Sequence, residues 1–169
     1  MFLIETERLN ITEFTPDMAG AVCENSHDED TRRFVPDEVF ETEEDAAQTI
    51  EFLMSRYGGS EGPFVYPVLL KDGTNIGYVQ AVPLDGGGWE IGYHIGGRYT
   101  KSGYATEAVK AFLPVIMKKL GISEIMGICL ADNAASRRVL EKCGFVTEYT
   151  GPGEYHGGRH EICRCCFRG

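Results

Sequence analysis

Apolar residues recur along the first part of the chain with two periods, which predict one strand and two helices. Apolar and polar residues alternate over 8–14, as in a strand with one face more buried than the other. The segment 15–25 opens with a threonine and a proline, which is typical of a helix start. A polar connection through Arg33 and Pro36 follows. The segment 42–57 opens with a threonine and three acidic residues and continues with apolar positions at helical spacing, so it is predicted to be a second helix.

The middle of the chain is predicted to form three strands in sequence. Apolar runs over 64–70, 74–84 and 89–95 are separated by turns rich in glycine and aspartate at 71–73 and 85–88. Short turns of this kind join neighbouring antiparallel strands, so a β-meander is expected.

Helices and strands alternate in the remainder of the chain. An apolar stripe at helical spacing predicts a long helix over 104–120, ended by two lysines and a glycine. Pro114 lies inside this helix and removes a hydrogen bond, so a bend or break is expected there. The later elements are predicted as a strand over 125–130, a helix from Asp132 or Asn133 to Lys142, and strands over 145–149 and 160–167. No internal repeat or low-complexity segment occurs, and residues 1–169 are expected to form a single domain.

The charges are unevenly distributed along the chain. The net charge is −10, from 26 acidic and 16 basic residues, which argues against a nucleic-acid-binding protein. No apolar run is long enough to cross a membrane. The first 62 residues hold 16 acidic and 4 basic residues, and the rest hold 10 acidic and 12 basic. This division suits a protein that handles one anion and one cation, although an acidic run such as 41–45 is also typical of a solvated helix start.

The six cysteines are expected to be reduced thiols. The first residues have no basic region and no long apolar core, so they do not form a signal peptide, and a cytoplasmic protein is predicted. Cys163, Cys165 and Cys166 lack the paired spacing of a zinc site. A buried last strand is the favoured interpretation of this cluster, and no metal site is predicted.

A glycine-rich loop directly precedes the long helix. Residues 96–103 contain three glycines and several donors. Unpaired N–H groups and the helix dipole attract anions at a helix start, so an anion is expected above residues 98–106. The loop matches neither the Walker motif nor the dinucleotide-binding glycine pattern.

Three motifs, in order, resemble those of the GNAT superfamily of N-acyltransferases. The run 98–108, RYTKSGYATEA, resembles its acyl-CoA pyrophosphate loop, and residues 4–9 resemble the start of its RimJ/RimL-like branch. Residues 133–136 followed by 140–145 are similar to its second motif, Asn-x-x-Ser with Gly-Phe at the helix end. The resemblance implies an α/β (α+β) acyl-CoA N-acyltransferase fold, with a central, mostly antiparallel sheet flanked by about four helices.

The resemblance also implies where acetyl-CoA, the cosubstrate, would bind. The edge of the strand would pair with the pantetheine amides, as an added strand would, and the helix start would hold the pyrophosphate. Lys101 stands where the pattern has its first glycine; its Cβ would obstruct the cofactor if the position needs positive φ, whereas its ammonium would reach a phosphate. The residues implied in cofactor binding are Tyr93, His94, Ile95, Arg98, Tyr99, Thr100, Lys101, Ser102, Gly103, Tyr104, Ala105, Thr106 and Asn133.

Two side chains match the catalytic positions of the RimJ/RimL-like branch. Glu90 matches a strand carboxylate that would act as general base through water, and its alternative is a solvent-facing strand residue. Ser136 matches a serine that would protonate the departing thiolate, and its alternative is a first-turn serine bonded to backbone. Leu140 stands where many other members have a tyrosine. The histidines His94, His156 and His160 are expected to be surface or packing residues.

The resemblance implies an N-acetyltransferase, a transferase that moves an acetyl group from acetyl-CoA to a primary amine by direct attack. A protein N-terminus and a small amine such as a polyamine remain open as acceptors, because the segments 31–40 and 149–160 that would border the acceptor do not decide between them. Many members dimerise, so a homodimer remains open as well. The alternative is a CoA-binding sensor without turnover, suggested by Lys101 and the missing tyrosine.

Overall fold

The computed structural model describes residues 2–34 and 38–169, whose strands form one eight-stranded sheet in the order β1-β2-β3-β4-β5-β6-β8-β7. All neighbouring pairs are antiparallel except β5 with β6. The mixed fold class and the meander are therefore confirmed. The strands are β1 (Leu3–Glu5), β2 (Leu9–Thr12), β3 (Phe64–Leu70), β4 (Asn75–Pro83), β5 (Trp89–Ile95), β6 (Glu124–Leu130), β7 (Val146–Tyr155) and β8 (Gly158–Arg168).

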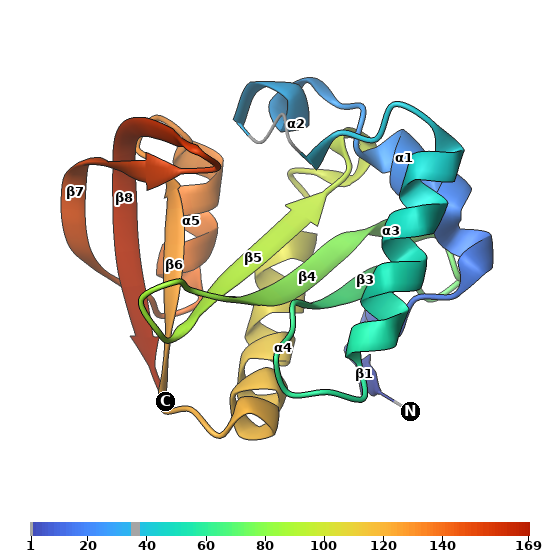
Figure 1. Cartoon of the computed structure of the whole chain (residues 1–169), viewed down its shortest axis with the longest axis horizontal. Helices are drawn as coiled ribbons and strands as arrows, with labels where there is room; N and C mark the ends of the chain where they lie inside the picture. Colours follow the sequence, from blue (N-terminus) through green and yellow to red (C-terminus); the bar gives the residue numbers. More distant parts are fainter. Residues whose placement is uncertain (1, 35–37) are drawn as a thin grey trace.

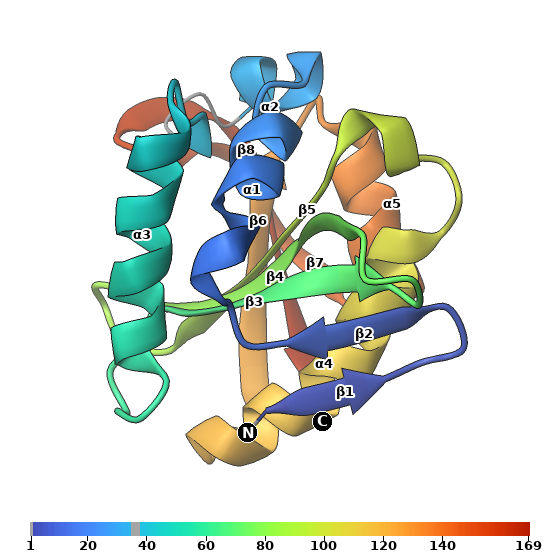
Figure 2. The same cartoon turned by 90° about the vertical axis from the view of Figure 1, so that its right-hand side faces the viewer.

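Helices cover both faces of the sheet (Figures 1 and 2). One face carries α1 and α3, and the other carries α4 and α5; α2 lies at the end of the molecule opposite the two termini. The hydrophobic core forms between these layers, with one buried cluster on each side of the sheet. The helices are α1 (Ala19–Asn25), α2 (Glu29–Phe34), α3 (Glu43–Arg56), α4 (Tyr104–Leu120) and α5 (Ala134–Lys142), with 3-10 turns η1 (Pro16–Met18) and η3 (Gly97–Tyr99).

Two elements of the first forty residues were not predicted from the sequence. The strand β1 has three residues, of which only Ile4 is buried, so it is too short to show an alternating pattern. The helix α2 replaces part of the expected polar connection, and Arg33 belongs to it. Its six residues are too few to show helical periodicity. Pro36, at the end of that connection, lies outside the described residues.

The long helix α4 continues through its proline, so of the expected bend or break at Pro114 the break is wrong. The proline lies on the exposed side of the helix, as does Lys110, whose carbonyl loses its helical donor. Water can satisfy that carbonyl on the exposed side. The opposite side packs into the core through six buried residues, Ala108, Val109, Phe112, Leu113, Ile116 and Met117, and this packing holds the helix together.

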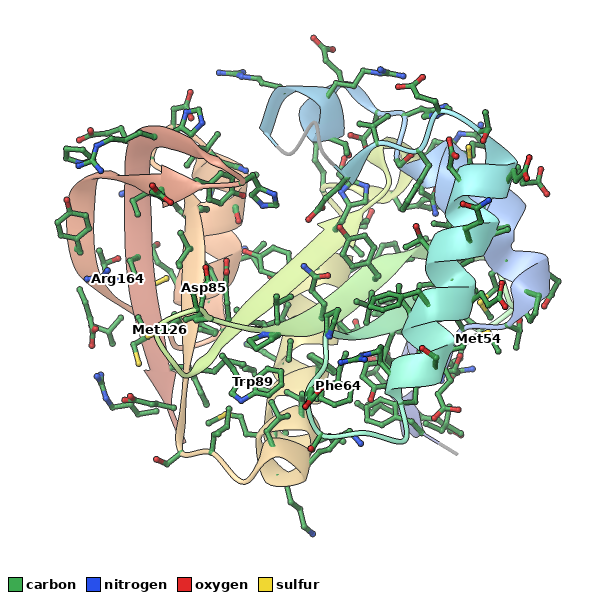
Figure 3. All side chains as sticks on the ribbon, in the orientation of Figure 1. Met54, Phe64, Asp85, Trp89, Met126 and Arg164 are labelled. Atoms are coloured by element: carbon green, nitrogen blue, oxygen red, sulfur yellow. The ribbon has the colours of Figure 1, made fainter. Side chains whose placement is uncertain are left out.

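The strands β5 and β6 diverge, and this divergence prepares the site. They pair only at Glu90 with Met126 and at Ile91 with Gly127. In contrast, β6 pairs with β8 along its whole length, and β4 pairs with β5 along all of β5. Figure 1 shows the two strands separating toward the end of the molecule where α2 lies. At the opposite end, Trp89 stacks on Phe64 with ring centroids 5.8 Å apart (Figure 3).

The last two strands form a longer hairpin than the sequence indicated. The strand β7 ends at Tyr155 and β8 begins at Gly158. The residue His156 at the tip of the hairpin has φ 47°. The cysteines of β8 are buried, as expected, and all six cysteines are free thiols. Within residues 2–34 and 38–169, no group of His, Cys, Asp or Glu side chains is arranged to hold a metal ion. No described helix combines the length and apolar character required to cross a membrane.

Candidate functional site

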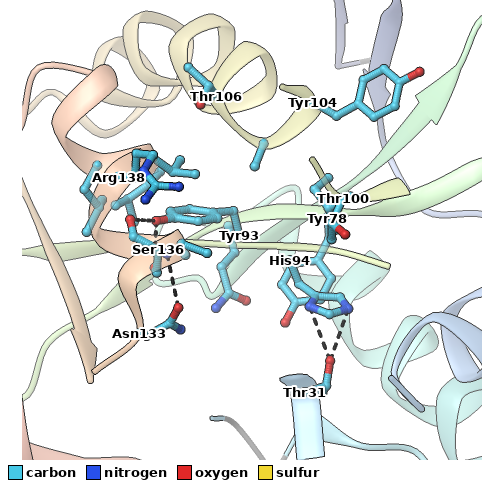
Figure 4. Close-up of a pocket in the computed structure, with 18 of the residues that line it drawn as sticks. Thr31, Tyr78, Tyr93, His94, Thr100, Tyr104, Thr106, Asn133, Ser136 and Arg138 are labelled. Atoms are coloured by element: carbon cyan, nitrogen blue, oxygen red, sulfur yellow. Dashed lines mark hydrogen bonds between the residues drawn. The ribbon is translucent and has the colours of Figure 1, made fainter. Parts of the chain in front are cut away.

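A cavity of about 570 Å³ opens where β5 and β6 diverge, between the start of α4, the first turns of α5, and α2. Figure 4 shows side chains from these elements facing one another. The cavity brings together thirteen of the fifteen side chains expected at the site: Glu90, Tyr93, His94, Ile95, Tyr99, Thr100, Lys101, Gly103, Tyr104, Ala105, Thr106, Asn133 and Ser136.

The other two expected residues, Arg98 and Ser102, do not line the cavity. The guanidinium of Arg98 contacts Glu24 of α1, with 2.6 Å between Nη2 and Oε1. Ser102 directs its carbonyl toward Arg8, whose Nη1 donates to it over 2.8 Å. Both residues therefore connect the loop to other parts of the protein.

The edge of β5 toward β6 is unpaired beyond Ile91 in the described part of the chain. Strand alternation sends Glu90 and His94 to one face of the sheet and Tyr93 to the other. Gly92 lies between them, and a Cβ at this position would come within 2.5 Å of the side chain of Gln80. The free edge offers backbone donors and acceptors to an extended, amide-bearing ligand.

The loop before α4 ends in two residues with left-handed backbone. Gly103 caps the helix with φ 81°, and Lys101 has φ 66°, so the position of the expected glycine does adopt positive φ. The first N–H groups of a helix have no partner within it, and here those of residues 104–106 point toward the cavity end of α4. Arg138 and Lys142 of α5 line the same cavity and add positive charge. This end of the cavity is suited to phosphate groups.

Residues near the N-terminus hold this loop in place. Arg8 donates from Nε to Oε1 of Glu107 over 2.8 Å, and its guanidinium lies 4.4 Å above the ring of Tyr104. Thr6 donates from its hydroxyl to Oε2 of Glu107 over 2.6 Å. The first motif of the sequence therefore has a structural role, because it fixes the first turn of α4.

Glu90 is a half-buried carboxyl group on the opposite side of the cavity. Burial raises the pKa of Glu90 to about 7, because the carboxylate loses hydration. His156 of the hairpin opposes this rise, and Glu38 adds to it. The group is therefore close to half-ionised at neutral pH, as a general base requires.

His94 forms an ion pair with Asp28, and neither side chain faces solvent freely. Nε2 of His94 lies 3.3 Å from Oδ2 of Asp28, and Thr31 lies within hydrogen-bond distance of the imidazole (Figure 4). Burial alone would lower the pKa of His94, but Asp28 and the carbonyl of Asn25 raise it. Burial would raise the pKa of Asp28, but His94 and Thr31 hold it at about 2. Through its contacts with Asp28 and Thr31, His94 joins β5 to the start of α2.

Ser136 lies in the first turn of α5, where two neighbours fix it (Figure 4). The backbone N–H of Ser136 donates to Oδ1 of Asn133 over 3.1 Å, which confirms Asn133 as the helix cap. The phenol oxygen of Tyr93 lies 2.8 Å from Oγ of Ser136 and 2.9 Å from its carbonyl oxygen. The hydroxyl of Ser136 therefore faces the cavity in a defined position.

The end of the cavity around Glu90 is acidic and includes residues that the sequence did not single out. Tyr78 donates to the carboxylate of Glu38, and Gln80 lies beside Gly92. Their register in the meander, with Tyr78 opposite His94, is the signal that would have identified them. Tyr155 and His156 also line the cavity, as expected for the hairpin tip. Residues 35–37 of the segment expected to border the acceptor lie outside the described residues.

The free strand edge, the helix start and the half-buried carboxyl group together suit the transfer of a group from an elongated anionic cosubstrate to a second substrate. Residues 8–146 match the family described as Acetyltransferase (GNAT) domain. The uncharacterized N-acetyltransferase YnaD of Bacillus subtilis is 34% identical over 147 residues, which cover 86% of this chain and 83% of that protein. The chain therefore belongs to the GNAT acetyltransferase family and is an acyl-CoA-dependent N-acetyltransferase.

Solved structures agree with this fold over nearly the whole chain. A GNAT-family acetyltransferase from Bacillus anthracis is 27% identical with a TM-score of 0.82, covering 99% of this chain and 98% of that one. RimL, a ribosomal L7/L12 alpha-N-protein acetyltransferase solved with coenzyme A, has the same TM-score of 0.82 and the same coverage of 99% and 98% at 15% identity. The expected fold is thereby confirmed.

Proposed function

We propose that this protein transfers an acetyl group from acetyl-CoA to a primary amine by direct attack, with Glu90 as general base and Ser136 as general acid. The observation that carries this proposal is the position of the two side chains. A half-buried carboxyl group with a pKa of about 7 and a fixed serine hydroxyl line one cavity, which also contains the start of α4.

The residues that line the cavity are suited to acetyl-CoA. The N–H groups at the start of α4, with Lys101, Arg138 and Lys142, would hold the phosphates. The free edge of β5 near Tyr93 would pair with the pantetheine amides. RimL was solved with coenzyme A, and its fold is shared by this chain, which supports the same mode of binding here.

Each proton has a defined place in the proposed reaction. Glu90, directly or through one water, takes a proton from the ammonium form of the acceptor and so releases the amine lone pair. The amine nitrogen then bonds to the thioester carbonyl carbon, and the carbon–sulfur bond breaks. The bonded nitrogen loses its second proton to solvent, Ser136 gives its hydroxyl proton to the departing thiolate and takes a replacement proton from solvent, and Glu90 returns its proton to solvent. Acetylated amine and free CoA leave the site.

The acceptor would be a cationic primary amine, such as a protein N-terminus or a polyamine. Three carboxyl groups, of Asp28, Glu38 and Glu90, line the cavity. Asp28 is already paired with His94, which leaves Glu38 and Glu90 as the groups that attract the acceptor. The motifs at residues 4–9 and 133–136 and the shared fold of RimL favour the RimJ/RimL-like branch.

The pH dependence of kcat/KM tests the base. Because the pKa of Glu90 is about 7, activity should rise as pH increases through 7, where the carboxylate forms. Glu90→Gln should lower kcat/KM about 10²-fold and remove this limb of the profile, leaving only the rise caused by deprotonation of the amine. An unchanged profile in Glu90→Gln would contradict the role of Glu90 as base.

A further inference from the structure

We propose that Tyr93 is a positioning residue, which holds the hydroxyl of Ser136 for delivery of its proton to the departing thiolate. This inference rests on the proposed function, since it requires Ser136 to act as the acid. Tyr93 was expected at the site only because its backbone lies on the free edge of β5. Its side chain, on the opposite side of the strand from Glu90, reaches the first turn of α5 instead.

The phenol of Tyr93 contacts Ser136 at two points. Its oxygen lies 2.8 Å from Oγ of Ser136 and 2.9 Å from the carbonyl oxygen of the same residue (Figure 4). Asn133 binds the backbone N–H of Ser136 over 3.1 Å. The residue is thus held at its N–H, its carbonyl and its hydroxyl, and the hydroxyl also lies beside the thiol of Cys129.

These contacts allow two hydrogen-bond arrangements, because a phenol has one proton and a carbonyl only accepts. In the first, Tyr93 donates to the carbonyl of Ser136 and accepts from its hydroxyl. In the second, Tyr93 donates to Oγ, and the serine proton is free to point into the cavity. The second arrangement is the one required when Ser136 gives its proton to the thiolate, because its oxygen then carries negative charge and needs a donor.

The surroundings keep this donor neutral. Burial raises the pKa of Tyr93 well above its usual range, and the hydrogen bond to Ser136 opposes the rise without cancelling it. The neighbouring thiols of Cys129 and Cys143 are also buried, which raises the pKa of each to about 11. Tyr93 therefore keeps its proton at neutral pH.

A double-mutant cycle tests whether Tyr93 acts through Ser136. We would measure thiol release from acetyl-CoA in wild type, Tyr93→Phe, Ser136→Ala and the double variant, using the panel amine that wild type turns over fastest. Tyr93→Phe should lower kcat about tenfold, the typical effect of one charge-assisted hydrogen bond, while KM for acetyl-CoA stays within about twofold. In the Ser136→Ala background the same change should cause no further loss of kcat.

Tyr57→Phe provides a matched control. The Tyr57 hydroxyl also has two partners, since it donates to the carbonyl of Val65 over 2.6 Å and accepts from the N–H of Phe14 over 3.0 Å, but it does not line the cavity. Its loss should lower the melting temperature without changing kcat. A titration with CoA for each variant checks that the binding site is intact.

The possible outcomes separate this proposal from the proposed function. If Ser136→Ala slows the reaction and the loss from Tyr93→Phe persists in the double variant, Tyr93 does not act through Ser136, and only the positioning role is overturned. The same holds if Tyr93→Phe weakens CoA binding and leaves kcat unchanged. If Ser136→Ala leaves kcat unchanged, the acid role fails and the role of Tyr93 fails with it. If Tyr93→Phe lowers kcat in the wild-type background and has no effect in the Ser136→Ala background, the result supports both the acid role of Ser136 and the positioning role of Tyr93.

Discussion

At the scale of single residues, the site holds titratable groups in unfavourable surroundings and secures them by contacts from distant parts of the chain. Glu90 is the main example: its half-buried position raises its pKa to about 7, which suits a base but disfavours the folded state at higher pH. His94 and Asp28 show the opposite arrangement, since each stabilises the charged form of the other.

The first residue-scale prediction concerns the stability of Glu90→Gln. The pKa of Glu90 is raised on folding, so its contribution to stability is present below its unfolded pKa and is lost as pH rises through about 7. Glutamine stays neutral at every pH. The variant should therefore have a free energy of unfolding about 2 kcal/mol above wild type at pH 8, and a much smaller difference at pH 5.

Urea unfolding at the two pH values measures this difference. Glu161→Gln is the control, because Glu161 is an exposed glutamate on β8, and its replacement should leave stability unchanged at both pH values. A Glu90→Gln protein that is less stable than wild type at pH 8 would contradict a destabilising carboxylate at this position.

Residue identities could be predicted where a motif is local, and could not where the partner is distant. Asn133 and Ser136 lie three positions apart in one helix turn, so the cap follows from spacing, whereas Ser136 was expected at the site from the family resemblance. The pair of His94 with Asp28 joins positions 66 residues apart, and the alternation of β5 alone does not reveal it. His94 was for that reason expected only as a surface or packing residue, or as part of the strand edge.

At the scale of elements, the start of α4 depends on the start of the chain. Arg8 contacts Glu107, the carbonyl of Ser102 and the ring of Tyr104, and so joins β2 to the loop expected to bind the pyrophosphate. The left-handed backbone of Lys101 is strained for a residue with a Cβ, and these contacts help to maintain it.

The element-scale prediction is that Arg8→Met weakens CoA binding, although Arg8 itself acts only through the loop that it holds in place. Methionine keeps an apolar stem but lacks the donors that fix Ser102 and Glu107, so the loop should lose its defined shape. We expect the dissociation constant for CoA, measured by calorimetry, to increase about fivefold.

Arg168→Met is the matched control for this change. Like Arg8, Arg168 makes more than one contact, here with the carboxylates of Glu148 and Glu124, but it does so at the end of β8 and does not line the cavity. Its replacement should leave CoA affinity unchanged. Equal affinities in Arg8→Met and wild type would contradict the anchoring role of Arg8.

Elements with a strong periodic pattern were predictable from the sequence, and short elements were not. The helix α4 and the strands β3 and β5 have the expected bounds, because long apolar stripes and glycine-rich turns delimit them. The short β1 pairs with β2, and Thr31 of α2 contacts His94 of β5, so the partners of both elements lie outside the local sequence. The divergence of β5 from β6, which creates the cavity, is a property of the whole sheet and leaves no local pattern.

At the scale of the whole molecule, the uneven charge along the sequence reappears in the cavity. The acidic first 62 residues supply Asp28 and Glu38 to its lining. The later part supplies Lys101, Arg138 and Lys142. Acidic and basic side chains in one cavity suit a cationic acceptor and an anionic cosubstrate.

The measurement that tests the central claim most directly is thiol release from acetyl-CoA in the presence of a panel of primary amines of different charge, at low and high salt. The account predicts that dicationic amines are acetylated fastest, and that their kcat/KM falls several-fold, roughly three- to tenfold, between low and high salt. Thiol release at one rate with every amine, or a preference for acidic amines that salt does not change, would contradict it.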